Sequence, residues 1–157
     1  MVLDKVKNKV KRGKKHKVGL FVDGPNIIRK EFNINLDKLR ERVEGYGRIV
    51  IGKVFLNQFA SEKLIEAIAN QGFEPVIALG GEEQEEGKSD VDVSMAVAIM
   101  EAVYRPMDII VIVTRDADFL PVIQKAKEMN KEVIVMAVEE GLSTALKNAA
   151  DKVELIG

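Results

Sequence analysis

The stretch DIIVIVTRDADFLPVI, residues 108–123, decides the fold class of this chain. Its five apolar residues from Ile109 to Val113 form an uninterrupted run, which is typical of a strand buried on both faces of a sheet. Two aspartates, Asp116 and Asp118, follow the run, and apolar residues then resume with the spacing of a helix. A buried strand that leads through an acidic loop into a helix indicates an α/β fold.

The same alternation of strand and helix extends along the rest of the chain. We expect strands at residues 18–23, 48–56, 73–79, 109–113, 132–138 and 152–156, and helices at 36–43, 61–72, 89–105, 118–130 and 143–150. Strands that alternate with helices imply right-handed crossovers, which place the strands parallel to one another. The sequence therefore predicts a single α/β domain with a mostly parallel central sheet and helices on both faces.

The composition supports one domain and restricts the kinds of site that it can hold. A chain of 157 residues with 46% hydrophobic residues is long enough for one ordinary core. It has no cysteine and one histidine, His16, which excludes disulfides, thiolate chemistry and a multi-histidine metal site. No apolar run approaches the ~20 residues of a membrane helix, and no secretory signal follows the basic N-terminus. We therefore expect a cytoplasmic protein without a membrane partner, in which any bound metal has oxygen ligands.

The charge is divided between a basic arm, residues 1–17, and an acidic domain, residues 18–157. The arm holds eight Lys or Arg residues and one Asp, which gives it a formal net charge of +7. The domain has a formal net charge of −8. A basic arm on an acidic domain is typical of contact with nucleic acid. The ordinary alternative is a solubilising tail. A third alternative is a helix that docks on a partner or membrane surface through Leu3, Val6 and Val10.

The acidic residues of the domain lie where an α/β sheet binds its ligands. Asp23 ends the first predicted strand, and Asp116 and Asp118 follow the fourth strand. Asp92 lies in the first turn of the helix that precedes the fourth strand. Ligands of such sheets bind at the carboxyl ends of the strands. If the first and fourth strands are neighbours, these carboxylates converge on one pocket.

Each carboxylate also has an ordinary explanation in local structure. Asp92 could answer Ser89 in a capping box, and Asp116 or Asp118 could cap the helix that follows. Asp23 could bond within the turn DGPN. Helix capping needs only one acceptor per helix, however, and does not explain carboxylates from separate segments at one edge of the sheet.

A group of carboxylates at one site favours a divalent cation, because like charges repel and the cation offsets that repulsion. Oxygen ligands suit Mg²⁺ or Mn²⁺. One or two such ions can activate water and stabilise charge on a phosphodiester during attack. Hydrolysis of phosphodiester bonds is therefore the chemistry that this set of residues suits best.

Four segments together resemble the NYN domain, a branch of the PIN-like ribonucleases, over residues 18–156. They are GLFVDGPNI, KSDVDVSMAVAI, IIVIVTRDADFLPVIQKAKEMNKEVIVMAV and LSTALKNAADKVELI. The resemblance implies a Rossmann-like PIN fold and metal-dependent cleavage of RNA, single-stranded or structured, with Mg²⁺ or Mn²⁺ as cofactor. It implies a catalytic and metal-binding set of Asp23, Asp92, Asp116 and Asp118.

Further residues are expected to contact the substrate. Some positions of this chain differ from the residues that the family commonly has there. We assign substrate binding to Asn26, Lys88, Thr114, Arg115 and Ser143, although Ser143 has an ordinary alternative as a helix cap. Thr114 and Arg115 stand where the family commonly has Ser-Gly. Ala98 stands where many relatives carry a further aspartate, for which Asp90 is a candidate substitute.

Three functional hypotheses follow from these residues. The first is a metal-dependent ribonuclease, and the second is a non-catalytic RNA-binding or regulatory module with the same fold, which Ala98 favours. The third is a different phosphate enzyme, against which stands the absence of P-loop and dinucleotide-binding motifs. A homodimer is one possible assembly.

Overall fold

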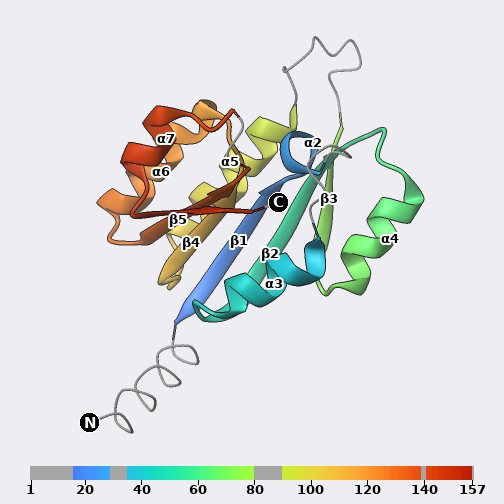
Figure 1. Cartoon of the computed structure of the whole chain (residues 1–157), viewed down its shortest axis with the longest axis horizontal. Coiled ribbons are helices and arrows are strands. Elements are labelled where there is room, and N and C mark those ends of the chain that lie inside the picture. The colour runs from blue at the N-terminus through green and yellow to red at the C-terminus, as the bar shows by residue number, and fades with distance from the viewer. Residues whose placement is uncertain (1–15, 29–34, 80–89, 139–140, 157) are drawn as a thin grey trace, which may run out of the picture.

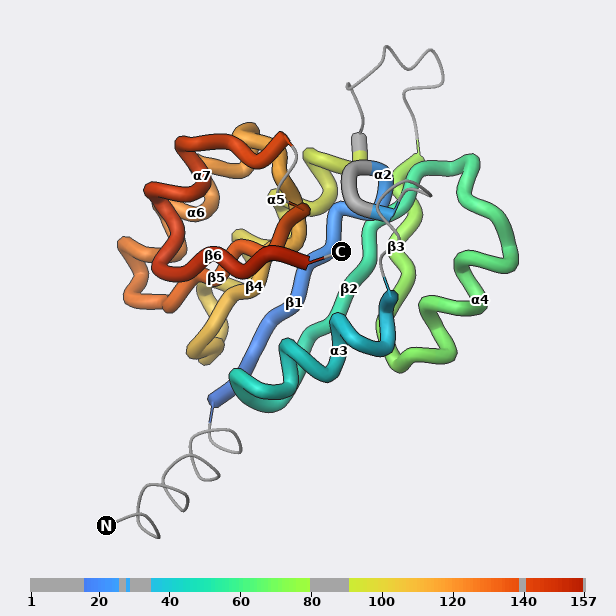
Figure 2. Tube along the Cα trace, viewed as in Figure 1, coloured from blue at the N-terminus to red at the C-terminus, as the bar shows by residue number. Residues whose placement is uncertain are grey.

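The structure is a computed structural model that describes residues 16–28, 35–79, 90–138 and 141–156, with the backbone alone for Asn26, Ile27 and Asp90. These residues form one parallel sheet with helices on both of its faces (Figures 1 and 2). The strands are β1 (Lys17–Asp23), β2 (Arg48–Asn57), β3 (Glu74–Ala78), β4 (Ile109–Val113), β5 (Glu132–Ala137) and β6 (Lys152–Leu155). The helices are α2 (Gly24–Ile27), α3 (Leu36–Glu44), α4 (Glu62–Asn70), α5 (Asp90–Val103), η2 (Ala117–Phe119), α6 (Leu120–Glu128) and α7 (Thr144–Ala149).

The strand order places the first and fourth strands side by side at the centre of the sheet. The order is β3-β2-β1-β4-β5-β6, and every pair within the described residues is parallel. The chain builds outward from β1 to β3, returns to β4 on the other side of β1, and builds outward again. The point of return is where open α/β sheets bind their ligands. The predicted fold class is therefore confirmed, and the condition that the first and fourth strands are neighbours is met.

Alternate side chains of the central strands point into two separate cores. Phe21, Ile110 and Ile112 pack with α5, α6 and α7, whereas Leu20 and Val111 pack with α3 and α4 on the other face. All five are buried. Burial of one such side chain contributes roughly 1.5–3 kcal/mol, so the unbroken apolar runs of β1 and β4 hold the centre of the sheet rigid. This centre positions the segments that leave its carboxyl edge.

Most element boundaries differ from the predicted ones by one or two residues, and three of the differences concern the kind of element or the limit of the arm. The GPN segment, expected as a loop, forms α2, in which Pro25 supplies a preset φ at the helix start. The helix expected at 118–130 begins as η2 and continues as α6, whose first turn contains Pro121. Strand β1 begins at Lys17, the last residue that we assigned to the basic arm. The rest of the arm and the acidic loop at 80–88 lie outside the described residues.

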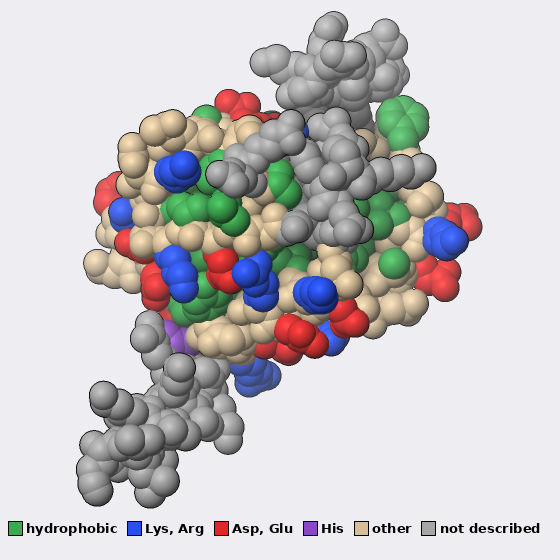
Figure 3. Space-filling model, in the orientation of Figure 1, with side chains coloured by type: hydrophobic (Ala, Val, Ile, Leu, Met, Phe, Trp, Pro, Cys, Tyr) green, Lys and Arg blue, Asp and Glu red, His purple; other side chains and the backbone are tan. Residues whose placement is uncertain are grey.

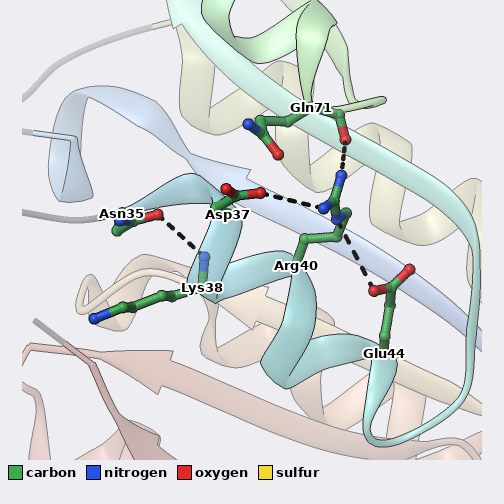
Figure 4. A network of polar contacts seen from close by, with 6 residues as sticks. All are labelled: Asn35, Asp37, Lys38, Arg40, Glu44 and Gln71. Carbon is green, nitrogen blue, oxygen red and sulfur yellow. Dashed lines mark hydrogen bonds and ion pairs between the residues drawn. The ribbon is translucent and has the colours of Figure 1, made fainter.

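Capping side chains and ion pairs fix the helices on the α3 side of the sheet (Figure 4). The Asn35 side chain accepts a hydrogen bond from the amide of Lys38 at 3.1 Å and so begins α3. Arg40 donates to Asp37 at 3.1 Å and to the carbonyl of Gln71 at 3.2 Å. This second bond ties α3 to the segment that ends α4.

Charged side chains of both signs are interspersed over the α3 face (Figure 3). Arg42, for example, lies 3.2 Å from Glu154 across α3 and β6. Among the described residues on this face, cations do not gather into a broad basic patch of the kind that binds nucleic acid. No helix in the described ranges has the length and apolar content needed to cross a membrane.

Candidate metal centre

Three segments of the chain bring aspartates to the carboxyl edge of the sheet. Asp23 is the last residue of β1, and Asp116 and Asp118 lie in the connection that leaves β4. Asp92 lies in the first turn of α5, which contacts both β1 and η2. Figure 1 shows α2 and the start of α5 at this same end of the sheet. The predicted site residues are therefore brought to one edge, although they come from distant parts of the chain.

Three of the four aspartates form a compact group. Asp92, Asp116 and Asp118 each offer one carboxylate oxygen, and these oxygens all lie within 4.8 Å of one another. Asp92 and Asp116 are half-buried, and Asp118 is exposed. Three converging oxygen ligands with access to solvent fit a small hard cation such as Mg²⁺ or Mn²⁺, which binds few carboxylates and keeps some of its water.

Crowding of the carboxylates makes Asp92 harder to ionise. Burial, together with the negative charges of Asp116 and Asp118, raises the pKa of Asp92 from 3.8 to about 6. A hydrogen bond with Asp116 acts in the same direction on that pKa. A divalent cation at these oxygens would favour the ionised form, because its charge offsets the repulsion among the three.

Asp23 joins this group indirectly, through a buried threonine. The Thr114 hydroxyl donates to Oδ2 of Asp23 at 3.0 Å and accepts from the amide of Asp116 at 3.2 Å. Thr114 is fully buried and Asp23 is 2% exposed. Asp23 is thus linked by Thr114 to the loop that carries two of the three clustered aspartates.

The ordinary capping explanation proves correct for Asp116. Oδ1 of Asp116 accepts from the amide of Asp118 at 2.9 Å and so begins η2. Asp23 directly precedes α2, yet within residues 16–28 its side chain makes no capping bond to that helix. A carboxylate has about four acceptor positions, so the cap on η2 leaves Asp116 able to bind a cation as well.

Arg115 and Ser143, both assigned to substrate, lie near one short connection after β5. A Cβ added at Gly141 would lie 2.6 Å from Nη1 of Arg115, so the guanidinium rests against this glycine. Gly141 also has a φ of +81°, a left-handed conformation that favours glycine. Ser143 accepts from the amides of Ala145 and Leu146 and caps α7, which confirms its ordinary explanation.

The remaining predicted positions are partly or wholly outside the described residues. Lys88 and Ser89 fall outside them, as do the side chains of Asn26 and Asp90. Ala98 is half-buried and packs against the core beneath α5. Sequence reasoning assigned Thr114 to substrate and missed its link to Asp23. The signal available was its place as the first polar residue after the run Ile109–Val113.

A solved structure of a bacterial protein has the same fold. The crystal structure of a protein of unknown function from Vibrio parahaemolyticus matches this chain with a TM-score of 0.79. The match covers 91% of this chain and 94% of the other, at 20% sequence identity. At that identity the likeness shows a shared fold and nothing further.

A curated relative is much more similar in sequence. An uncharacterized protein of Methanocaldococcus jannaschii is 57% identical over 148 residues, which cover 94% of this chain. The chain spans 58% of the length of that relative. The family model of the NYN domain matches residues 17–156, nearly the whole sequence and every element of the sheet. The chain therefore belongs to the NYN domain family, within the PIN-like nucleases.

Proposed function

We propose that this protein is a metal-dependent ribonuclease that hydrolyses RNA phosphodiester bonds at its cluster of aspartates. The observation that carries the proposal is the convergence of oxygens from Asp92, Asp116 and Asp118 within 4.8 Å at the carboxyl edge of β4. These residues would hold Mg²⁺ or Mn²⁺, with Asp23 as a further acidic group at the same edge. Membership of the NYN family supports RNA as the substrate.

The protein contributes to this chemistry chiefly by fixing the positions of the aspartates. A bound divalent ion would activate water and stabilise negative charge on the phosphate during attack. Thr114 bonds both Asp23 and the backbone of the loop after β4, so that loop has little freedom to move. Ligands held by buried partners are preorganised, which lowers the cost of binding the ion and the charged transition state.

The partner, the location and the assembly of the protein are also proposals. We propose single-stranded or structured RNA as its partner and the cytoplasm as its location, and a homodimer stays a prediction. The domain itself is acidic, with a charge balance of −8 over residues 18–157. We propose that Arg115 and Lys88 bind RNA phosphates. Asn26 and Ser143 are proposed as further contacts to the RNA.

The proposal is tested by cleavage of a mixed RNA pool with and without divalent ions. We expect cleavage with Mn²⁺ or Mg²⁺ and none with EDTA, because the three carboxylates need a cation to act together. The metal concentration needed for half-maximal cleavage should rise as the pH falls below about 6, where protons compete for Asp92. Gel analysis of labelled RNA measures both effects.

Activity that survives EDTA would contradict a metal-dependent site. Binding of RNA without cleavage under any divalent ion would instead favour the alternative function, a non-catalytic RNA-binding module. The observation that favours this alternative is Ala98, a packing residue of α5 where many relatives have an acidic side chain. The same assay therefore separates the two candidates.

Deletion of the basic arm should weaken RNA binding and reduce its dependence on salt. Residues 1–15 are the segment to delete, because Lys17 belongs to β1 and its amide bonds to Asp108 at 2.8 Å. They carry seven Lys or Arg residues. For each RNA phosphate that the arm neutralises in the intact protein, its deletion should flatten the slope of log affinity against log salt by about 0.7 for single strands.

Fluorescence anisotropy at several salt concentrations measures that slope. A control variant with the same length and Gln at the seven basic positions separates charge from chain length. Equal slopes for the intact and shortened proteins would show that the arm is a solubilising tail.

A further inference from the structure

Among the phenylalanines that the structure describes, Phe59 differs from the rest in how far its side chain is exposed to solvent. Of the five phenylalanines in the described residues, four are buried, at 0–5% exposure. Phe59 is 72% exposed. Burial of a Phe side chain contributes roughly 1.5–3 kcal/mol to the free energy of unfolding. The exposed ring of Phe59 contributes little of this. Single exposed apolar side chains are common on protein surfaces, so the case for a binding role depends on where Phe59 lies.

Phe59 lies at the same edge of the sheet as the aspartate cluster. It follows the end of β2 at Asn57 by two residues, and β2 pairs directly with β1. In that pair Phe55 lies opposite Asp23. Two strand spacings, about 10 Å, separate β2 from β4. The ring is therefore within reach of a short run of nucleotides that leaves the cluster.

The backbone beneath the ring is held by hydrogen bonds on both sides. The amide of Phe59 donates to Oδ1 of Asn57 at 2.9 Å, and the amide of Ala60 donates to the Asn57 carbonyl at 3.2 Å. Ser61 then caps α4 by accepting from the amide of Leu64 at 3.1 Å. Because this backbone is fixed, only the side-chain torsions of Phe59 remain to be ordered when the ring binds a ligand.

A second exposed apolar side chain follows the end of the neighbouring strand at this edge. Leu79 is 73% exposed and directly follows Ala78, which pairs with Asn57 in the β2–β3 register. Phe59 and Leu79 thus extend from the ends of neighbouring strands, on the β2–β3 side of the carboxyl edge. They give this edge an apolar surface next to its acidic one.

We infer that Phe59 stacks on an unpaired base of single-stranded RNA, beside Leu79, while the phosphodiester to be cleaved lies at the aspartates. The inference rests on the proposed function and adds to it a choice of substrate. A base has an apolar face that stacks on an aromatic ring whatever its identity. Paired bases inside a duplex do not offer that face, so this contact selects unpaired RNA over duplex RNA.

Tyr104 provides a matched control at the other end of the molecule. It is 65% exposed, directly follows the end of α5, and so lies toward the amino edge of β4. It resembles Phe59 in size and exposure and differs in its distance from the aspartates. A general effect of losing a surface aromatic residue would appear equally in both positions.

The test uses tryptophan as a reporter, since the chain has none of its own. Phe59→Trp and Tyr104→Trp are each made in the full chain with Asp116→Asn, to slow turnover, and titrated with a single-stranded oligouridylate. We expect quenching of emission for Phe59→Trp alone, and much weaker quenching with an RNA duplex. Without a reporter, Phe59→Ala should weaken binding of the single strand by about 5- to 150-fold, and Tyr104→Ala should not.

The outcomes distinguish this inference from the proposed function. Unchanged affinity in Phe59→Ala, with intact RNA binding by the parent protein, would overturn the stacking role and leave the ribonuclease proposal in place. A shift of Phe59→Trp emission that depends on protein concentration without RNA would also overturn it, because the ring would then be covered by a second copy. Failure of the parent protein to bind or cleave any RNA would remove the proposed function itself. Equal melting temperatures of the variants verify that each is folded.

Discussion

Asp116→Asn is expected to reduce RNA cleavage by on the order of 100-fold or more while RNA binding is retained or strengthened. The change removes one of the three clustered carboxylates, and with it one negative charge, from the site that we propose receives an RNA phosphate. Asn can still accept the hydrogen bond from the amide of Asp118, so η2 should remain capped. Initial rates at saturating Mn²⁺, beside anisotropy measurements of RNA affinity, separate the loss of chemistry from the loss of binding.

The matched control for this variant lies at the other end of the same strand. Asp108 immediately precedes β4, is exposed, and accepts from the amide of Lys17 at 2.8 Å. Asp108→Asn removes the same charge at the amino edge of the sheet and should leave cleavage unchanged. If both variants cleave RNA at the rate of the parent protein, the metal centre has been assigned to the wrong residues.

Thr114→Val is expected to destabilise the protein and to impair cleavage together. The change keeps the volume of the side chain but removes the hydroxyl that donates to the buried carboxylate of Asp23. Loss of a hydrogen bond to a buried charged group costs about 1.5–3 kcal/mol. For a domain of this length each kcal/mol lowers the melting temperature by roughly 2–4 °C, which thermal unfolding can measure.

Thr114→Ser separates the hydroxyl from the packing of the threonine methyl group. Serine keeps the donor to Asp23 and the acceptor for the amide of Asp116, so cleavage should stay close to that of the parent protein. A Thr114→Val protein that melts and cleaves like the parent would show that Asp23 is held by other contacts. A protein that is folded but inactive would place the role of Thr114 in positioning the site.

The fold could be predicted almost entirely from local patterns in the chain. The apolar run Ile109–Val113 is a strand buried on both faces, and the alternation of strands and helices determined a parallel sheet. Hydrophobic periodicity and the residues that end helices act over a few positions, so they are visible in the sequence. The short helix α2 was missed because a proline at a helix start resembles a turn in sequence.

The candidate site was predictable in its residue types and only partly in its arrangement. The sequence indicated that Asp92, Asp116 and Asp118 lie at one edge, because strand ends in a parallel sheet share an edge. It did not indicate that Asp23 is linked to them through Thr114, a contact between residues 91 positions apart.

Such contacts depend on the order of strands and on packing between elements distant in the chain. The placement of β1 beside β4 is what brings the Asp23 carboxylate to the Thr114 hydroxyl. Phe59 illustrates the same limit, since its place between a predicted strand and a predicted helix does not by itself show how far its ring is exposed. Periodicity along the chain was therefore enough for the sheet, its helices and the acidic edge. Burial and long-range hydrogen bonds, which arise only when distant segments pack, decided which side chains position the site and which remain exposed beside it.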